Sequence, residues 1–276
     1  MKYTLNICIP WASLLLSLAV TQSALAQKVH IAHCLAGCPA GAPAANEIVV
    51  RHLFAASINY QSGLADWVAY RVLPGSIGVA SLLPRSWEVD ELLNGAARTE
   101  VESGPRFIQP DLSNQQDGAY RINEIIINAE DRGRLVPMSS FAGTPFWEDL
   151  NYLSNMAPLP SDLRVGPWSR LDQAVNEMSA QVGEVYVVSG PLYLVGENLI
   201  ADGEGGRRPS AYFKFITTEA RYAAFIFPQN APQHSNYCEF ASSMESIQRD
   251  SGLRLLPQQS EPATASLQTL LGCGSN

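Results

Sequence analysis

The sequence predicts an α+β fold built around a mostly antiparallel β-sheet, on the basis of three strand-like segments and one long amphipathic helix. Residues 184–189, 211–217 and 221–227 are rich in aromatic and β-branched residues, and a few residues join the last two, as in a hairpin. Apolar residues recur at helical spacing before these strands: Trp168, Leu171, Val175, Met178 and Val182. A second helix is expected over 240–250, with Gly252 as its stop. The elements lack a regular strand–helix–strand rhythm, which favours α+β.

The N-terminal half is less regular. Residues 48–55 and 67–73 are expected to form strands, each with an alternating polar side. Residues 74–120 are rich in Pro, Gly, Ser and Asp, which predicts a long irregular excursion. Residues 124–127 suit either a short strand or the start of a helix.

The first residues are typical of a secretory signal rather than of a folded domain. Lys2 is followed by an apolar run centred on 14–20, and small residues at 24–26 suit a signal peptidase, so cleavage is expected after Ala26. The alternative is a membrane anchor, but the apolar run is short for a spanning helix. No later stretch is long enough to cross a bilayer. We therefore expect a signal peptide at 1–26, a single domain at 27–276, and a secreted or periplasmic protein without a membrane partner.

The cysteines fit an exported protein. Four of them lie beyond the expected signal: Cys34, Cys38, Cys238 and Cys273. In an oxidising compartment they suggest two disulfide bonds, with three possible connectivities. Local pairing, Cys34 with Cys38 and Cys238 with Cys273, would close one tight loop and one long loop. The alternative is a zinc site that includes His33, although the second cysteine pair lacks the usual close spacing.

Composition predicts a folded but acidic protein. Its 276 residues suit one large domain or two small ones, and the charged fraction of 16% argues against disorder. Removal of residues 1–26 leaves 17 basic and 26 acidic residues, a net charge of −9. Because most nonspecific affinity for nucleic acid comes from neutralising phosphates, any polyanion site must be a local basic patch.

Two segments stand out as candidates for chemistry. Residues 131–137 read DRGRLVP, and residues 152–172 read YLSNMAPLPSDLRVGPWSRLD. Alone, the first predicts a charged turn with Gly133 at its corner, in which Asp131 and Arg132 form a solvated ion pair. The second predicts a loop that leads into the amphipathic helix, in which Asn155 caps or braces the loop.

Together, the two segments resemble the DNA/RNA nonspecific endonuclease family, and most closely its secreted Serratia-type members. That family carries a DRGH stretch followed by a segment like YLSNxxPQxxDLNxGxWxxLE. Further segments that look like this family are HCLAGCPAG near the mature start, DWVAYRV at 66–72, SGPLY at 189–193, SAYFK at 210–214 and the closing LLGCG. The resemblance covers nearly the whole mature chain.

The resemblance implies a ββα-metal fold with a central antiparallel sheet flanked by helices, and cleavage of DNA and RNA phosphodiesters with one Mg²⁺. In the family, the DRGH histidine is the general base, an asparagine on the following helix is the metal ligand, arginines hold phosphate, and a helix acid orients metal-bound water. Position by position, Arg132 and Asn155 are kept, and Asp172 replaces the helix glutamate. Arg85, in the PRSW stretch, matches an upstream phosphate-binding arginine.

Three positions depart from the family's pattern: Arg134 replaces the base, Arg164 replaces the metal ligand, and Leu159 replaces a glutamine. Arginine stays protonated near neutrality and has no lone pair for a metal. Two unit charges about 4 Å apart repel by about 4 kcal/mol at an effective dielectric near 20, and a divalent ion feels about twice that. We therefore expect no metal ligand at these positions, and we expect Mg²⁺ to be nearly excluded. The histidines look structural or superficial rather than like substitute bases: His30, His33, His52 and His234.

The remaining site residues have two interpretations. We expect catalytic positions at Arg132, Arg134, Asn155 and Asp172, and phosphate-binding positions at Arg85, Arg132 and Arg164. In this interpretation the arginines form a cationic cluster that binds phosphate. In the other, Arg134 and Arg164 pair with Asp131, Asp162 or Asp172 in a structural salt-bridge network.

Three functions follow from the sequence. The leading hypothesis is a pseudoenzyme that binds DNA or RNA phosphates with little or no hydrolysis. The second is an active Mg²⁺-dependent endonuclease with a rearranged site. The third is a catalytically dead interaction partner, which forms a homodimer or pairs with an active nuclease in a heterodimer.

Overall fold

The structure is a computed structural model, and it describes residues 29–59, 64–84, 88–93, 120–122, 125–127, 132–194, 209–259 and 265–274. The expected signal peptide at 1–26 lies outside the described residues, and so do Arg85 and Asp131. The extent of the domain, 27–276, stays a prediction. Among the described residues, no helix combines the length and apolar character needed to span a bilayer.

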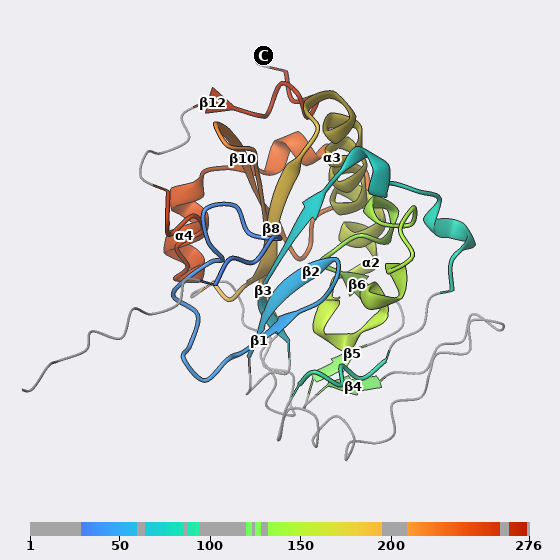
Figure 1. Ribbon diagram of the computed structural model, residues 1–276. Coiled ribbons are helices and arrows are strands. Elements are labelled where there is room, and N and C mark those ends of the chain that lie inside the picture. Colours follow the sequence, from blue (N-terminus) through green and yellow to red (C-terminus); the bar gives the residue numbers. More distant parts are fainter. Residues whose placement is uncertain are drawn as a thin grey trace, which may run out of the picture.

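A single large sheet organises the chain (Figure 1). Its path runs β1-β2-β3-β8-β9-β10-β11, with β12 alongside β10. The bounds are β1 (Glu47–Val50), β2 (Phe54–Ile58), β3 (Ala65–Val72), β8 (Val185–Leu192), β9 (Ala211–Thr217), β10 (Arg221–Pro228), β11 (Ala241–Ser242) and β12 (Ala265–Ser266). Every pairing along the path is antiparallel, and only β12 is parallel to its neighbour. The predicted antiparallel α+β architecture is confirmed.

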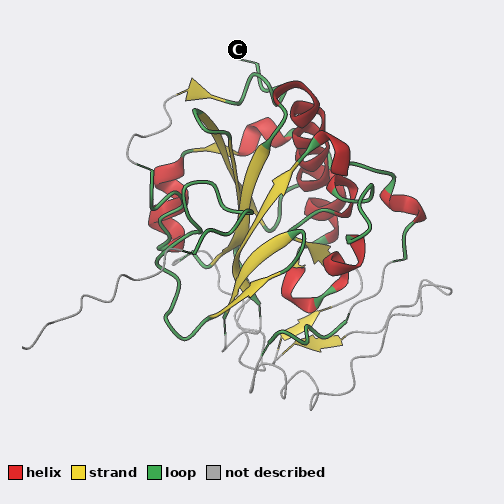
Figure 2. Ribbon diagram, viewed as in Figure 1, coloured by secondary structure: helices red, strands yellow, loops and turns green. Residues whose placement is uncertain are grey.

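The best-predicted strands form the centre of this sheet. The segments expected at 67–73, 184–189, 211–217 and 221–227 correspond to β3, β8, β9 and β10. All seven residues of β9 are buried, because helices cover both faces of the sheet there. Figure 2 shows the strands between helix α3 on one side and helix α4 on the other.

The prediction of one strand over 48–55 was wrong, because the chain turns in the middle of it. β1 and β2 are two antiparallel strands, and the Arg51 backbone N–H donates to the Phe54 carbonyl at 2.8 Å to close the turn. The first two residues of the turn have polar partners outside the sheet: Arg51 pairs with Asp90, and His52 pairs with Asp149. These contacts favour a turn over a continued strand.

The helices lie on the two faces of the sheet, each with its own hydrophobic cluster. α3 (Ser169–Val182) buries the predicted stripe, except that Val182 at its last turn is 39% exposed. α4 (Met244–Ser251) begins later than the predicted 240–250, after the 3-10 helix η8 (Tyr237–Phe240). Gly252 ends α4 in the left-handed conformation, with φ of 74°, as expected.

A smaller ββα unit consists of a two-stranded sheet and the helical segment that ends in α3. β6 (Arg132–Arg134) pairs antiparallel with β7 (Met156–Pro158), and the chain continues into α2 (Ser161–Leu163), the π-type turn η7 (Arg164–Trp168) and α3. The DRGR stretch therefore enters a strand, and its prediction as a turn was wrong. Gly133 is required in that strand, because a Cβ there would lie 2.4 Å from the Leu159 side chain.

Short elements complete the described chain. β4 (Tyr120–Ile122) pairs with β5 (Ile125–Ile127), so the open choice at 124–127 resolves to a strand over its last three residues. The 3-10 helices are η1 (Pro74–Ser76), η2 (Ala80–Leu82), η4 (Met138–Ser140), η5 (Trp147–Asn151) and η6 (Leu153–Asn155). The structure contains both locally paired disulfides, Cys34–Cys38 and Cys238–Cys273, which rules out the zinc alternative.

Candidate functional site

Arg134, at the family's base position, is held by neutral groups. Its Nε donates to the Leu150 carbonyl at 3.1 Å, and its Nη2 donates to Asn151 Oδ1 at 2.7 Å. Both acceptors belong to the end of η5. Because a carbonyl and an amide oxygen carry no net charge, these bonds fix the half-buried guanidinium without neutralising it.

The backbone of Arg132 pairs with Pro158 across the β6–β7 ladder, and its side chain is outside the described part. The residues on either side of Arg85 also meet this region. Pro84 offers its carbonyl to Asn151 Nδ2 at 3.4 Å, and the Glu88 N–H donates to the Asn151 carbonyl at 2.9 Å. The chain on both sides of Arg85 is therefore tied to the residue that holds Arg134.

Asn155 braces the site from inside. It is fully buried, and its Oδ1 accepts from the Val136 N–H at 2.8 Å. Its Nδ2 donates to the carbonyls of Val136 and Leu150, both at 3.1 Å. The interpretation as a loop brace is confirmed, and the Leu150 carbonyl that Asn155 binds is the same one that Arg134 binds. Asn155 thus fixes the backbone that positions the guanidinium, while a catalytic role for it stays a prediction.

Arg164 lies at the bend between α2 and α3. It is the first residue of η7, and its N–H donates to the Pro160 carbonyl at 2.8 Å. The bend centres on Gly166, whose φ of −97° and ψ of −122° are not helical, next to Pro167. A Cβ on Gly166 would lie 2.6 Å from the Gln233 carbonyl oxygen, so this close approach requires glycine. Local packing therefore constrains the backbone that carries the half-buried Arg164 side chain.

Asp172 pairs with a lysine that the sequence analysis missed. Lys214 of β9 is fully buried, its Nζ donates to Asp172 Oδ1, and the same Nζ lies 3.9 Å from the centre of the Trp168 ring. Burial raises the pKa of Asp172, and the Lys214 ammonium opposes that rise. Burial likewise lowers the pKa of Lys214. The signal for it was a single charged residue inside the apolar run AYFKFIT.

These contacts bear on the predicted salt-bridge network. Asp172, one of its three proposed acids, is bound by Lys214, and Asp162 is exposed. Asp131 lies outside the described residues. Two acceptors of Arg134, the Leu150 carbonyl and the Asn151 amide oxygen, are neutral, and both interpretations of the arginines stay predictions.

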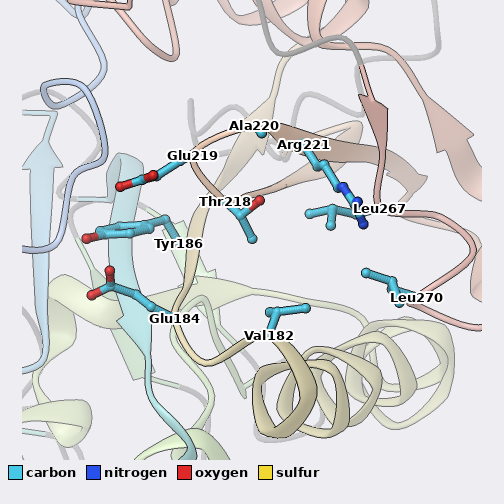
Figure 3. Close-up of a pocket in the computed structure, with 9 residues that line it drawn as sticks. All are labelled: Val182, Glu184, Tyr186, Thr218, Glu219, Ala220, Arg221, Leu267 and Leu270. Carbon is cyan, nitrogen blue, oxygen red and sulfur yellow. The ribbon is translucent and has the colours of Figure 1, made fainter.

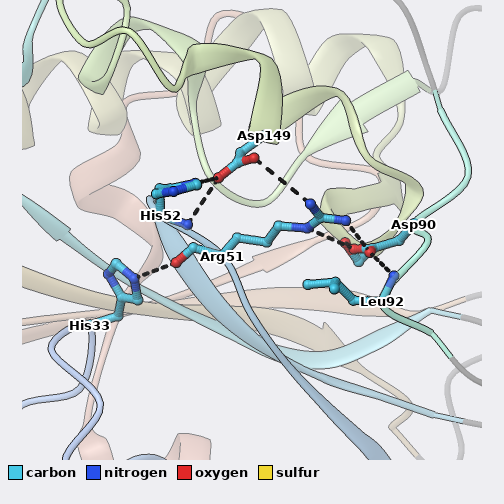
Figure 4. Close-up of polar contacts among 7 residues, drawn as sticks. His33, Arg51, His52, Asp90, Leu92 and Asp149 are labelled. Atoms are coloured by element: carbon cyan, nitrogen blue, oxygen red, sulfur yellow. Dashed lines mark hydrogen bonds and ion pairs between the residues drawn. The ribbon is translucent and has the colours of Figure 1, made fainter.

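A second polar cluster adjoins the site (Figure 4). Arg51 pairs with Asp90, which is fully buried and also accepts from Ser154 Oγ. The Arg51 guanidinium carbon lies 3.6 Å from the centre of the Tyr152 ring. A second carboxylate, Asp149 Oδ1, is 3.9 Å from Arg51 Nη1. This cluster ties the β1–β2 turn to the loop that carries Asn151 and Asn155.

The four histidines contact the backbone, a carboxylate or solvent. His33 Nε2 is 2.9 Å from the Arg51 carbonyl, and burial lowers the pKa of His33. His52 Nδ1 is 3.1 Å from Asp149 Oδ2. His30 and His234 are exposed.

The residues at the family's metal position do not fit Mg²⁺. Arg164 offers no lone pair, and Asn155 is enclosed, with its amide oxygen bonded to Val136 N–H. Asp172 is occupied by Lys214. Throughout the described ranges, no group of three or more His, Cys, Asp or Glu residues is arranged to hold a metal ion.

A cavity of about 350 Å³ lies elsewhere, at the other end of α3 from Arg164 (Figure 3). Apolar side chains from α3 and the C-terminal segment line it, together with Glu184 before β8, Glu219 in the β9–β10 turn and Arg221 at the start of β10. Two carboxylates at its mouth make it a poor site for phosphate.

A β6–β7 pair followed by a helix, packed on a central antiparallel sheet, defines the class of ββα nucleases. The sequence profile of the DNA/RNA non-specific endonuclease family matches residues 38–261, and the chain belongs to this family. It is 32% identical over 258 residues to the nuclease of Serratia marcescens, an alignment that covers 88% of this chain and 90% of that protein.

More distant relatives share parts of the chain. Human mitochondrial endonuclease G is 28% identical over 150 residues, which cover 46% of this chain and 48% of that protein. Among solved structures, a chain of the EndoG/EndoGI complex superposes with a TM-score of 0.61 and 18% identity, covering 81% of this chain and 91% of that chain. This likeness supports the fold alone.

Proposed function

We propose that this protein binds the phosphate backbone of DNA or RNA without sequence preference, and that it hydrolyses phosphodiester bonds poorly or not at all. The observation that carries the proposal is Arg134, a permanent cation at the position where the family places its base. Two of its N–H groups donate to the Leu150 carbonyl and the Asn151 amide oxygen, neither of which supplies a counter-charge. The proposed binding surface is the arginine cluster: Arg85, Arg132, Arg134 and Arg164.

The chemistry of the side chains separates binding from hydrolysis. A guanidinium offers several N–H donors that match phosphate oxygens, so arginines at these positions favour phosphate binding. Hydrolysis also needs a group that accepts a proton from water and a ligand set that holds Mg²⁺. Neither Arg134 nor Arg164 supplies these functions, and Asp172 is bound by Lys214.

We also propose that the protein acts outside the cytoplasm, in the periplasm or the extracellular medium. Its two disulfides, Cys34–Cys38 and Cys238–Cys273, support this location, because such bonds persist in oxidising compartments. In this proposal, the signal-like segment at 1–26 directs the protein to export.

One assay set tests the hydrolysis part of the proposal. Plasmid cleavage with Mg²⁺ is compared for the wild type and for Arg134→His combined with Arg164→Asn. We expect little cleavage by the wild type and a clear gain by the double variant, which restores a titrating base and a neutral oxygen ligand. A wild type that already cleaves as fast as the double variant contradicts the proposal and supports a rearranged, active site instead.

A second assay tests binding. Fluorescence anisotropy with a labelled oligonucleotide, at several salt concentrations, should show affinity that falls steeply with salt. Arg134→Met should weaken binding, while the exposed Arg249→Met, which pairs with Asp250 on α4, serves as a charge-matched control. Equal affinity for wild type and Arg134→Met would remove Arg134 from the binding surface.

A further inference from the structure

Two exposed rings form a stacked pair on the surface next to the arginine site. The Phe146 and His52 rings are parallel within 4°, and their centres are 4.1 Å apart. Phe146 is 45% exposed, and the His52 side chain is 62% exposed. An exposed phenyl ring stabilises little of the fold, because it leaves much of its apolar surface in water. The pair therefore presents flat aromatic surface to solvent.

Hydrogen bonds hold the His52 ring of this pair in place. The His52 backbone N–H and its Nδ1 both contact Asp149 Oδ2, at 2.9 and 3.1 Å. The Asp149 N–H donates in turn to the Phe146 carbonyl at 3.0 Å, so the residue that holds His52 is also bonded to the Phe146 backbone. Arg51, which is anchored on buried Asp90, lies beside the same carboxylate. Figure 4 shows His52 and Arg51 converging on Asp149 from the β1–β2 turn.

The ring pair and the guanidinium of Arg134 share one short element. Asp149 fixes His52, and the next two residues, Leu150 and Asn151, supply the two acceptors of Arg134. A 3-10 helix advances about 2 Å per residue, so these anchors lie within about 4 Å along its axis. The ring pair and the guanidinium of Arg134 are therefore held by adjacent residues of one element.

We propose that the His52–Phe146 pair is a stacking platform for a nucleobase of the strand whose phosphate Arg134 binds, a subsite that rests on the proposed function. Every base has a π-face, so stacking on a protein ring is tolerant of sequence. Inside a duplex, neighbouring base pairs cover both faces of each base. The platform therefore selects single-stranded DNA or RNA, or unpaired ends, over an intact duplex.

Binding to matched oligonucleotides tests this proposal. The probes are a single strand with normal bases, a strand of the same length built from abasic sites, and a duplex with the same number of phosphates. They are bound to the full-length mature protein and to Phe146→Ala, His52→Ala and Phe146→Trp. The matched control is Val182→Ala, because Val182 is a comparably exposed apolar residue at the far end of α3. Thermal melting checks that each variant is folded.

The expected result is that the normal strand binds at least about fivefold tighter than the abasic strand, the lower range for one base stacked on one ring. Phe146→Ala and His52→Ala should reduce this ratio toward one, while Phe146→Trp and Val182→Ala retain it. A strand with 2-aminopurine should show quenched fluorescence on the wild type and less on Phe146→Ala.

The alternative outcomes separate the two proposals. Equal affinity of the wild type for the normal and abasic strands overturns the platform and leaves phosphate binding standing. A ratio that survives Phe146→Ala also overturns it, because the base then stacks elsewhere. Failure of the wild type to bind any of the probes overturns both proposals.

Discussion

Replacing Lys214 by methionine should destabilise the protein strongly. Methionine matches the length of the lysine stem but removes the ammonium group from a fully buried position. Asp172, whose side chain is only 7% exposed, would then keep a carboxylate in the interior without its cationic partner. The contact of Nζ with the Trp168 ring would be lost as well.

The magnitude follows from the burial of both partners. Breaking a buried ion pair by removing one member costs about 3–5 kcal/mol, because the other charge is left unpaired. Replacing both members by apolar residues of similar size is close to neutral or even stabilising, in the range of about 0–4 kcal/mol. We therefore expect the double variant Lys214→Met with Asp172→Leu to be more stable than Lys214→Met alone.

Urea unfolding at several pH values measures these differences in the free energy of unfolding. Burial raises the pKa of Asp172, and without Lys214 nothing opposes that rise. A raised folded-state pKa means that folding favours the protonated acid. The deficit of Lys214→Met is therefore largest at neutral pH and shrinks as the pH falls toward the ordinary carboxyl value of about 3.9.

Two results would refute this reasoning. A loss below about 1 kcal/mol at neutral pH is the range of solvent-exposed pairs and would show that the pair is not desolvated. A double variant as unstable as Lys214→Met would show that lost packing, and not the stranded carboxylate, causes the effect.

Asn155→Ala should lower the free energy of unfolding by about 2–4 kcal/mol, because it strands buried backbone groups; thermal melting measures it. Arg134→Met should reduce the slope of log affinity against log salt by about 0.7–0.9, as one phosphate contact is lost. Replacing Cys238 and Cys273 by alanine opens a loop of 35 residues and should cost about 3–4 kcal/mol in urea unfolding.

Each of these predictions has its own contrary outcome. An Asn155→Ala protein that melts like the wild type would mean that water replaces the lost amide bonds. An unchanged salt slope for Arg134→Met would place the phosphate contacts elsewhere. A cysteine variant of wild-type stability would mean that the C-terminal segment docks without its covalent tie.

The local pattern of apolar and polar residues predicted those helices and strands whose formation depends mainly on their own residues. The alternation in β8 to β10 and the stripe of α3 are properties of one segment each, and both are confirmed. The split of 48–55 depends instead on Arg51 reaching Asp90 and on His52 reaching Asp149, 39 and 97 residues away. No local pattern contains those partners.

The same distinction applies to the site. The order of the motifs singled out Arg134 and Arg164, because family resemblance works on sequence positions. It gave no sign of what Arg134 touches, since one acceptor is the Leu150 backbone carbonyl, which any residue would supply, and the other is the Asn151 side-chain amide oxygen. It also missed Lys214, because the partner that makes its burial tolerable lies on α3.

The carbonyl of Leu150 receives hydrogen bonds from Arg134 and from Asn155. Opening of the 147–155 segment would therefore break a hydrogen bond of Arg134 and one of Asn155 in the same event. The Val136 amide hydrogen, which Asn155 also binds, becomes exposed in the same event. Its rate of exchange with deuterated solvent would report how often this segment opens.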